Sequence, residues 1–222
     1  MKSRILNFRN LLRPVFPQLF VLAKGLGLLY SPRSFLRSSG YLRSVGANRP
    51  CRMDGTPIPW MNYHIVAFLE ERLRRDHALF EFGSGNSTKF FAQLVGSVVS
   101  VECDPEWYER VRADIPSNVH LILSSPFDEQ KYLQVLRDQQ TKFDVIVIDA
   151  KAREACLGEA HAWLTDRGVL ILDDAARVAY QPAIAAILAR GFRKLDFEGL
   201  KPGGLRAYRT IVFYRDNNAL GI

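Results

Sequence analysis

The eight residues from Glu81 to Thr88 read EFGSGNST and could form a ligand-binding turn. Gly83 and Gly85 allow the backbone to bend sharply and to approach a bound molecule closely. The dinucleotide pattern GxGxxG requires a third glycine where this chain has Thr88, and the Gly-Lys-Ser/Thr end of a P-loop is absent. The turn therefore favours an adenosine-bearing ligand other than a dinucleotide.

Two acids accompany this turn. Glu81 ends an apolar run, and a carboxyl group at the end of a buried strand is costly without a polar partner. We therefore predict that Glu81 contacts the ligand, with turn capping as the alternative. Glu102 follows the next apolar run, about 20 residues beyond the glycines, which is the spacing of a ribose-binding acid.

Three further acids, Asp149, Asp173 and Asp174, follow the fourth and fifth predicted strands. If those strands are neighbours, the carboxylates converge, and their mutual repulsion would be relieved by a divalent cation such as Mg²⁺. The alternative for Asp173 is to cap the segment that follows it.

Short apolar strands and helical segments alternate through the chain from about residue 61. The expected strands are residues 78–82, 97–101, 119–123, 143–148 and 168–172, and the expected helices are 61–75, 87–94, 105–115, 127–139, 154–164 and 181–190. This alternation predicts a doubly wound, mostly parallel α/β sheet with helices on both faces.

The end of the chain breaks the alternation. Two further strands, residues 192–197 and 210–214, are separated by too few residues for a crossover helix. We therefore expect an antiparallel C-terminal hairpin, which completes a seven-stranded sheet.

From residue 78 to about residue 215, these motifs in this order resemble the class I S-adenosylmethionine-dependent methyltransferases. The resemblance implies a Rossmann-like methyltransferase fold with S-adenosylmethionine as the cofactor. It implies that the cofactor is held by Glu81, Gly83, Ser84, Gly85, Ser87, Thr88, Glu102, Ser124 and Asp149. Ser124 also fits ordinary turn chemistry, because it lies close to a proline.

The strand-end acids resemble those of metal-dependent O-methyltransferases. That resemblance implies that Asp149, Asp173 and Asp174 bind Mg²⁺, which lowers the pKa of a substrate hydroxyl group. Asp149 and Lys151 are the predicted catalytic residues, with Lys151 as proton acceptor. In the family the lysine stands three residues after the first aspartate, whereas here it stands two after, and a solvated lysine is the alternative.

The predicted function is therefore methyl transfer to a hydroxyl group, of a sugar, a glycan or another small polyol. The Asn/Asp-Pro-Pro-aromatic run of amino-group methyltransferases is absent after the fourth strand, where the chain reads Ile148-Asp149-Ala150-Lys151. One alternative is an RNA methyltransferase that grips phosphates with its basic arm. Another is a non-catalytic scaffold with this fold.

Residues 1–50 differ from the predicted methyltransferase domain, residues 51–222. All 23 acidic residues lie at or beyond Asp54, whereas basic residues begin at Lys2. Residues 1–30 are also rich in apolar side chains, without the roughly 20 uninterrupted apolar residues of a membrane span. We predict a helical arm that lies on a membrane surface, basic on one side and apolar on the other. Packing on the domain and an organelle transit peptide are the alternatives.

The cysteines bear on the compartment. The chain has three, Cys51, Cys103 and Cys156, without CxxC spacing, which favours reduced thiols in a cytoplasmic setting. We therefore expect a cytoplasmic protein, peripheral on the inner face of a membrane. The sequence does not fix the oligomeric state.

Overall fold

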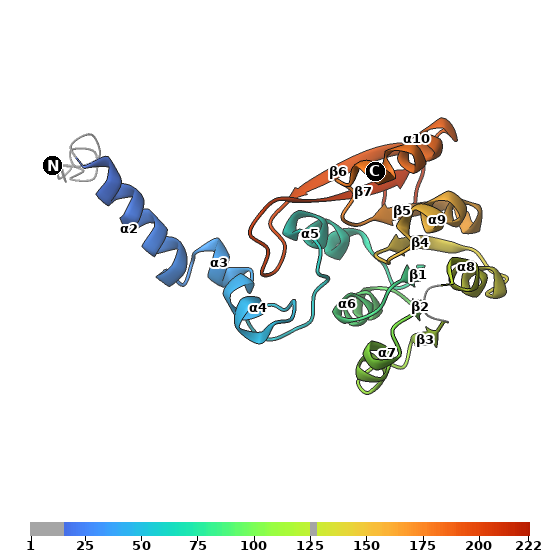
Figure 1. Cartoon of the computed structure of the whole chain (residues 1–222), viewed down its shortest axis with the longest axis horizontal. Coiled ribbons are helices and arrows are strands. Elements are labelled where there is room, and N and C mark those ends of the chain that lie inside the picture. The colour runs from blue at the N-terminus through green and yellow to red at the C-terminus, as the bar shows by residue number, and fades with distance from the viewer. Residues whose placement is uncertain (1–15, 125–127) are drawn as a thin grey trace.

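The computed structural model describes residues 16–124 and 128–222. Its centre is a seven-stranded sheet with the order β3-β2-β1-β4-β5-β7-β6. The strands are β1 (Ala78–Phe82), β2 (Ser97–Glu102), β3 (Val119–Leu123), β4 (Phe143–Ile148), β5 (Leu164–Leu172), β6 (Arg193–Gly199) and β7 (Tyr208–Tyr214). The first five strands pair in parallel, and β7 runs antiparallel to both β5 and β6. The predicted mostly parallel sheet with its antiparallel hairpin is confirmed (Figure 1).

Helices cover both faces of this sheet. They are α5 (Tyr63–Arg72), α6 (Asn86–Leu94), α7 (Pro105–Arg112), α8 (Glu129–Asp138), α9 (Arg153–Ala160) and α10 (Gln181–Ala189). One apolar core joins the sheet to α8, α9 and α10, and a second joins it to α5 and α6. Successive side chains of β1 alternate between these cores, so Phe80 and Phe82 face α8 and Leu79 faces α6. Glu81 shares the face of Leu79, which directs its carboxyl group toward α6.

The expected boundaries differ from the structure around the fifth strand. The helix expected over residues 154–164 runs instead as α9 from Arg153 to Ala160, followed by the 3-10 turn η1 (His161–Trp163). Strand β5 then begins at Leu164, four residues before the expected start at Gly168. Its register with β4 shifts between Phe143 and Val145, so the extra residues are accommodated by a local irregularity.

The N-terminal segment has an outer and an inner part. Helix α2 (Pro17–Tyr30) has no buried residue and projects away from the sheet (Figure 1). The short helices α3 (Phe35–Ser38) and α4 (Tyr41–Ala47) return the chain to the body. There the hydroxyl group of Tyr41 donates to the carbonyl oxygen of Gly204 at 2.9 Å. The position of the predicted domain boundary at residue 50 stays a prediction.

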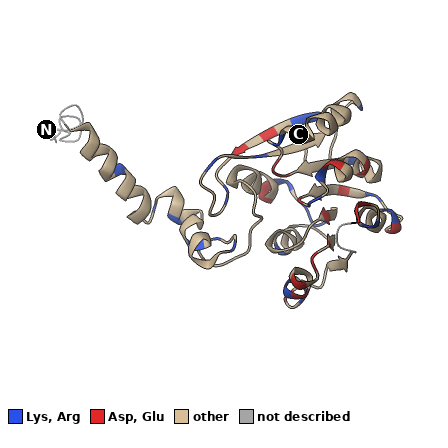
Figure 2. Ribbon diagram, in the orientation of Figure 1, with Lys and Arg blue, Asp and Glu red and all other residues tan. Residues whose placement is uncertain are grey.

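Helix α2 differs from the helix that we expected with one basic and one apolar side. Lys24 is its single charged residue, which Figure 2 shows as one blue band in an otherwise tan helix. The sequence PQLFVLAKGLGLLY places apolar residues at positions all around the helix axis. The nearest basic residues that the structure describes, Arg33 and Arg37, follow the helix. The predicted arm residues 1–15 lie outside the described residues.

Candidate functional site

The glycine turn lies between β1 and α6, at the carboxyl edge of the parallel strands. Gly83 has φ +106°, and a Cβ atom there would lie 2.5 Å from the carbonyl oxygen of Asp149. Gly85 has φ +147° and lies against the indole ring of Trp107. Both positions need glycine, Gly83 for close approach to the chain leaving β4 and both for their backbone conformation. The turn is thereby held directly beside Asp149.

The carboxyl group of Glu81 is linked to this turn by hydrogen bonds. The residue is 1% exposed, and its Oε2 accepts hydrogen bonds from Thr88 Oγ1 at 2.6 Å and Ser100 Oγ at 3.1 Å. Thr88 Oγ1 also accepts from the backbone N–H of Gly85 at 3.0 Å, so the carboxyl group and the turn belong to one network. This network explains why a threonine stands where the dinucleotide pattern has glycine.

The pKa of Glu81 reflects this enclosure. Burial raises it from 4.5 to about 7, and the charge of Asp149 adds to the increase, while the hydroxyl groups of Ser87, Thr88 and Ser100 oppose it. Glu81 Oε1 is buried and accepts no hydrogen bond from the described residues. The hydrogen bonds of Glu81 are thus with Thr88 of α6 and Ser100 of β2, and its direct contact with a ligand stays a prediction.

Glu102, the last residue of β2, faces the same turn from the neighbouring strand. Its Oε2 accepts from Ser84 Oγ at 2.7 Å, and its Oε1 accepts from the backbone N–H groups of Cys103 at 2.8 Å and Asp104 at 3.0 Å. Asp104 caps the N-terminus of α7 through the N–H groups of Glu106 and Trp107. Glu102 is therefore fixed beside the glycine turn, where a ribose-binding acid is expected.

Ser124 follows β3, the next strand outward. Its backbone N–H donates to the carbonyl oxygen of Glu102 at 2.7 Å, and its buried hydroxyl group has no hydrogen-bond partner among the described residues. Ser87, in the first turn of α6, is also buried. The structure thus brings all the predicted cofactor residues to the carboxyl ends of β1 to β4. It places Ser124 at the outer end of this group and Asp149 at the inner end.

The acids after β4 and β5 also converge, and basic side chains lie among them. Arg153, from the first turn of α9, forms an ion pair with Asp149, and its Nη2 lies 3.9 Å from Asp174 Oδ2. Lys201, from the β6–β7 connection, places Nζ 3.5 Å from Asp174 Oδ1. Arg177 Nη2 lies 3.7 Å from the other oxygen of Asp174.

Asp173 is the most deeply buried acid of this group, at 2% exposed. Its Oδ1 accepts a hydrogen bond from Thr210 Oγ1 of β7 at 2.6 Å. Burial, together with the charge of Asp149, raises the pKa of Asp173 to about 7. Burial also raises the pKa of Asp149, and the positive charge of Arg153 opposes that increase.

This arrangement does not fit the predicted magnesium site. Among residues 16–124 and 128–222, no three Asp, Glu, His or Cys side chains are placed so that they could hold a metal ion. The positive charge between Asp149 and Asp174 comes from Arg153 and Lys201. The acids therefore converge as predicted, but the structure does not support the Mg²⁺ assignment for Asp149, Asp173 and Asp174.

The predicted proton acceptor Lys151 follows Asp149 by two residues. It is exposed on the turn after β4, and its charge lowers the pKa of the Cys103 thiol, against a larger increase caused by burial. Lys201, which was not predicted from the sequence, contacts Asp174. Arg153, which begins α9 four residues after Asp149, was not predicted either.

Comparisons with known proteins agree with this geometry. Residues 80–175 match the family described as Methyltransferase domain. A precorrin-6y C5,15-methyltransferase from Geobacter metallireducens GS-15 superposes with a TM-score of 0.55 at 15% identity, covering 68% of this chain and 87% of that one. A methyltransferase from Pyrococcus furiosus gives a TM-score of 0.50 at 20% identity, with 68% and 81% covered. No curated protein sequence matches the chain.

The fold is also similar to that of a spermidine synthase from Thermotoga maritima, with a TM-score of 0.53 and 13% identity, covering 71% of this chain and 58% of that one. The fold alone therefore does not decide the activity. The family match is more informative about the activity than the fold is, because residues 80–175 contain the glycine turn and all five strand-end acids. Residues 80–175 therefore match a methyltransferase domain, and the chain has the Rossmann-like methyltransferase fold.

Proposed function

We propose that the protein transfers the methyl group of S-adenosylmethionine to a hydroxyl oxygen of a small polar acceptor, a sugar or another polyol. The hydroxyl oxygen forms a bond to the methyl carbon while the bond from that carbon to the sulfonium sulfur breaks. The hydroxyl proton passes to a carboxylate of the site, and the products are a methyl ether and S-adenosylhomocysteine. Because this is an in-line displacement, the protein must chiefly orient the acceptor oxygen.

The observation that carries the cofactor assignment is the position of Glu102 beside the glycine turn. Its Oε2 bonds Ser84 of the turn, and its Oε1 is held by two backbone N–H groups. The vicinal hydroxyl groups of a ribose can donate hydrogen bonds to a carboxylate in this position. S-adenosylmethionine carries such a ribose, next to the sulfonium centre.

The choice of an oxygen acceptor is supported by the acids on the other side of the turn. Asp149 lies beside the glycine turn, and Asp173 follows the neighbouring strand β5. A hydroxyl group can donate to either carboxylate, and that hydrogen bond would direct its oxygen lone pair toward the methyl group. We propose Asp149 as the catalytic residue, and the role of Lys151 as proton acceptor stays a prediction.

Calorimetric titration with S-adenosylhomocysteine tests the cofactor site. We expect wild-type protein to bind it and Glu102→Ala to lose at least about tenfold in affinity, because two ribose hydrogen bonds are lost. Glu109→Ala, at an exposed position on α7, is the matched control. A folded wild-type protein that binds no S-adenosylhomocysteine would refute the assignment and favour the scaffold alternative. The acceptor class is then tested by methyl transfer to polyols and, for the other alternative, to RNA.

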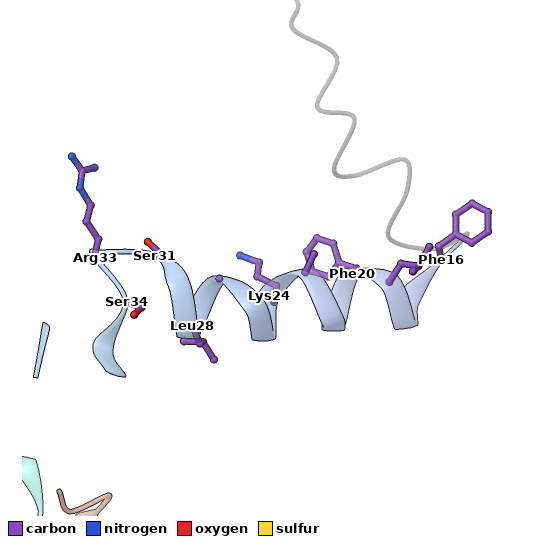
Figure 3. A pocket seen from close by; sticks show the side chains of 10 residues that line it. Phe16, Phe20, Lys24, Leu28, Ser31, Arg33 and Ser34 are labelled. Atoms are coloured by element: carbon purple, nitrogen blue, oxygen red, sulfur yellow. The ribbon is translucent and has the colours of Figure 1, made fainter. Parts of the chain in front are cut away.

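We also propose that the N-terminal arm lies on a membrane surface that carries anionic lipid. Helix α2 exposes Leu19 at 61%, Val21 at 69% and Leu22 at 58%, and a helix that is apolar on all sides is normally buried. Figure 3 shows side chains projecting from this helix, among them Phe20 and Leu28, with Phe16 just before its first residue. In the part of the chain that the structure describes, no helix has the length and apolar character to cross a bilayer.

The charges on either side of α2 in the sequence favour binding to anionic lipid. No acidic residue occurs before Asp54, and basic residues lie on both sides of the helix in the sequence, Arg9 and Arg13 before it and Arg33 and Arg37 after it. Each basic side chain near an anionic leaflet adds about 1 kcal/mol to binding. The arm would thereby hold the enzyme at the inner face of a membrane, near membrane-attached acceptors.

A further inference from the structure

Two basic side chains are enclosed with the acids at the ends of β4 and β5. Arg153 pairs with Asp149 and also lies 3.9 Å from Asp174, while Lys201 Nζ lies 3.5 Å from Asp174 Oδ1. The side chain of Arg153 is 10% exposed and that of Lys201 is 17% exposed. Solvent therefore screens these charges weakly, and each carboxylate experiences them strongly.

We propose that Lys201 and Arg153 supply, as permanent parts of the chain, the positive charge that a divalent cation would supply among these carboxylates. The inference rests on the proposed function only for its catalytic consequence, which is that protein side chains alone orient the acceptor hydroxyl. The charge arrangement itself can be measured without any turnover. It assigns positioning roles to two residues that lie outside the predicted site.

Lys201 is held in place before any ligand binds. Its Nζ lies 4.0 Å from the centre of the Tyr208 ring, which favours a cation over the ring face. The connection that carries it is fixed by two hydrogen bonds from side chains much earlier in the chain. Trp60 Nε1 donates to the carbonyl oxygen of Pro202 at 2.8 Å, and Tyr41 Oη donates to that of Gly204 at 2.9 Å.

Arg153 is also held in place by contacts within the chain. Its Nη1 donates to the carbonyl oxygen of Ala150 at 2.5 Å, so the guanidinium group bridges the turn after β4 and the Asp149 carboxylate. A divalent cation bridging Asp149 and Asp174 would have to displace this group and lie against Lys201, and like charges at that distance repel. The wild-type chain should therefore reject such a cation.

Removing one of the fixed charges should reverse this preference. We expect wild-type protein to leave the electron paramagnetic resonance signal of free Mn²⁺ unchanged. Lys201→Met keeps the length of the side chain but leaves Asp174 without its lysine, and should bind Mn²⁺ at least about tenfold more tightly than wild type. Lys201→Arg retains the charge and is the matched control, which should behave as wild type does.

A second substitution locates the bound ion. Adding Asp174→Asn to Lys201→Met should abolish the Mn²⁺ binding, because it removes the carboxylate that Lys201 had paired. Mg²⁺ should likewise raise the melting temperature of Lys201→Met and leave that of wild type unchanged. If Lys201→Met does not fold, Lys201→Gln replaces it in the same measurements.

Two outcomes would overturn the proposal. One is wild-type protein that binds one Mn²⁺ per chain and loses it in Asp174→Asn, which would restore the metal site predicted from the sequence. The other is a folded Lys201→Met that binds no Mn²⁺. Titration of the same proteins with S-adenosylhomocysteine separates these results from a failure of the proposed function, because that titration reports on the Glu102 side of the turn.

Discussion

At the scale of single residues, Gly83 has little freedom to change. A methyl group there would lie 2.5 Å from the Asp149 carbonyl oxygen, on a residue with φ +106°. Gly83→Ala should therefore destabilise the fold by about 1–3 kcal/mol and weaken binding of S-adenosylhomocysteine at least about tenfold. Urea unfolding and calorimetry measure the two effects.

Gly158 provides the comparison for Gly83. It lies on the exposed side of α9, and a Cβ atom there would meet nothing within 4 Å. Gly158→Ala should stabilise the protein by up to about 1 kcal/mol, because alanine is the better helix former. Equal effects at the two glycines would contradict the close approach of the turn to β4.

Glu81 makes stability depend on pH. Its pKa is about 7 in the folded protein and 4.5 when exposed, so the folded state holds a proton that the unfolded state has lost between these values. The contribution of Glu81 to the free energy of unfolding is therefore full below pH 4.5 and falls as pH rises to about 7. The decrease is about 3 kcal/mol for a shift of this size.

Glu81→Gln removes this titration while keeping the shape of the side chain. Relative to wild type, the variant should gain stability between pH 5 and pH 8, by up to about 3 kcal/mol in urea unfolding. Glu154→Gln, at an exposed position on α9, controls for the loss of one carboxyl group. A constant difference between Glu81→Gln and wild type across this range would show that Glu81 is ionised throughout.

At the scale of elements, the β6–β7 connection depends on helix α4 of the N-terminal segment. Tyr41 of α4 is buried, and its hydroxyl group bonds the carbonyl oxygen of Gly204. Tyr41→Phe would leave that oxygen without its partner and should lower stability by about 1–2 kcal/mol. Hydrogen exchange of residues 200–205 should quicken with it.

The control for Tyr41 is Tyr30→Phe on α2, where the side chain is 69% exposed. It should change neither stability nor exchange. If Tyr41→Phe leaves the exchange of residues 200–205 unchanged, then the connection holds Lys201 without the help of α4.

The elements were predictable where one local pattern decided them. Apolar strands alternating with helices indicate a parallel sheet, and the short link before residue 210 indicates the antiparallel hairpin. Contacts between distant segments were not predictable. Lys201 reaches Asp174 because β7 and β6 extend the sheet beyond β5. No local sequence pattern near residue 201 predicts this ion pair. Arg153 was missed because the expected helix began one residue too late.

At the scale of the whole molecule, α2 is the element that the rest of the fold leaves uncovered. Its 14 residues span roughly 21 Å, less than the roughly 30 Å hydrocarbon core of a bilayer. The helix can therefore insert at the surface while the sheet and the glycine turn remain in water. Its contact with the body runs through α3, where Arg37 Nε donates to the carbonyl oxygen of Leu29 at 3.1 Å.

Leu22→Glu tests this arrangement in the full chain. We expect wild-type protein to sediment with vesicles of phosphatidylcholine and phosphatidylserine, and to bind pure phosphatidylcholine vesicles more weakly. A glutamate in the apolar surface of α2 should reduce the bound fraction at least about tenfold, since it places a charge in the apolar layer beside anionic lipid. Val178→Glu, at a residue 84% exposed on the body, should bind as wild type does.

Light scattering without vesicles measures the oligomeric state, and so tests whether a second copy of the chain covers the apolar surface of α2 instead of lipid. If α2 packs against a second copy, wild-type protein should be a dimer in solution and Leu22→Glu a monomer, with no sedimentation on vesicles by either. If the arm binds lipid, raising the salt concentration should weaken vesicle binding, because the basic residues on either side of α2 contribute electrostatically. Affinity for S-adenosylhomocysteine should be equal in wild type and Leu22→Glu, because α2 has no buried residue and lies far from the glycine turn (Figure 1).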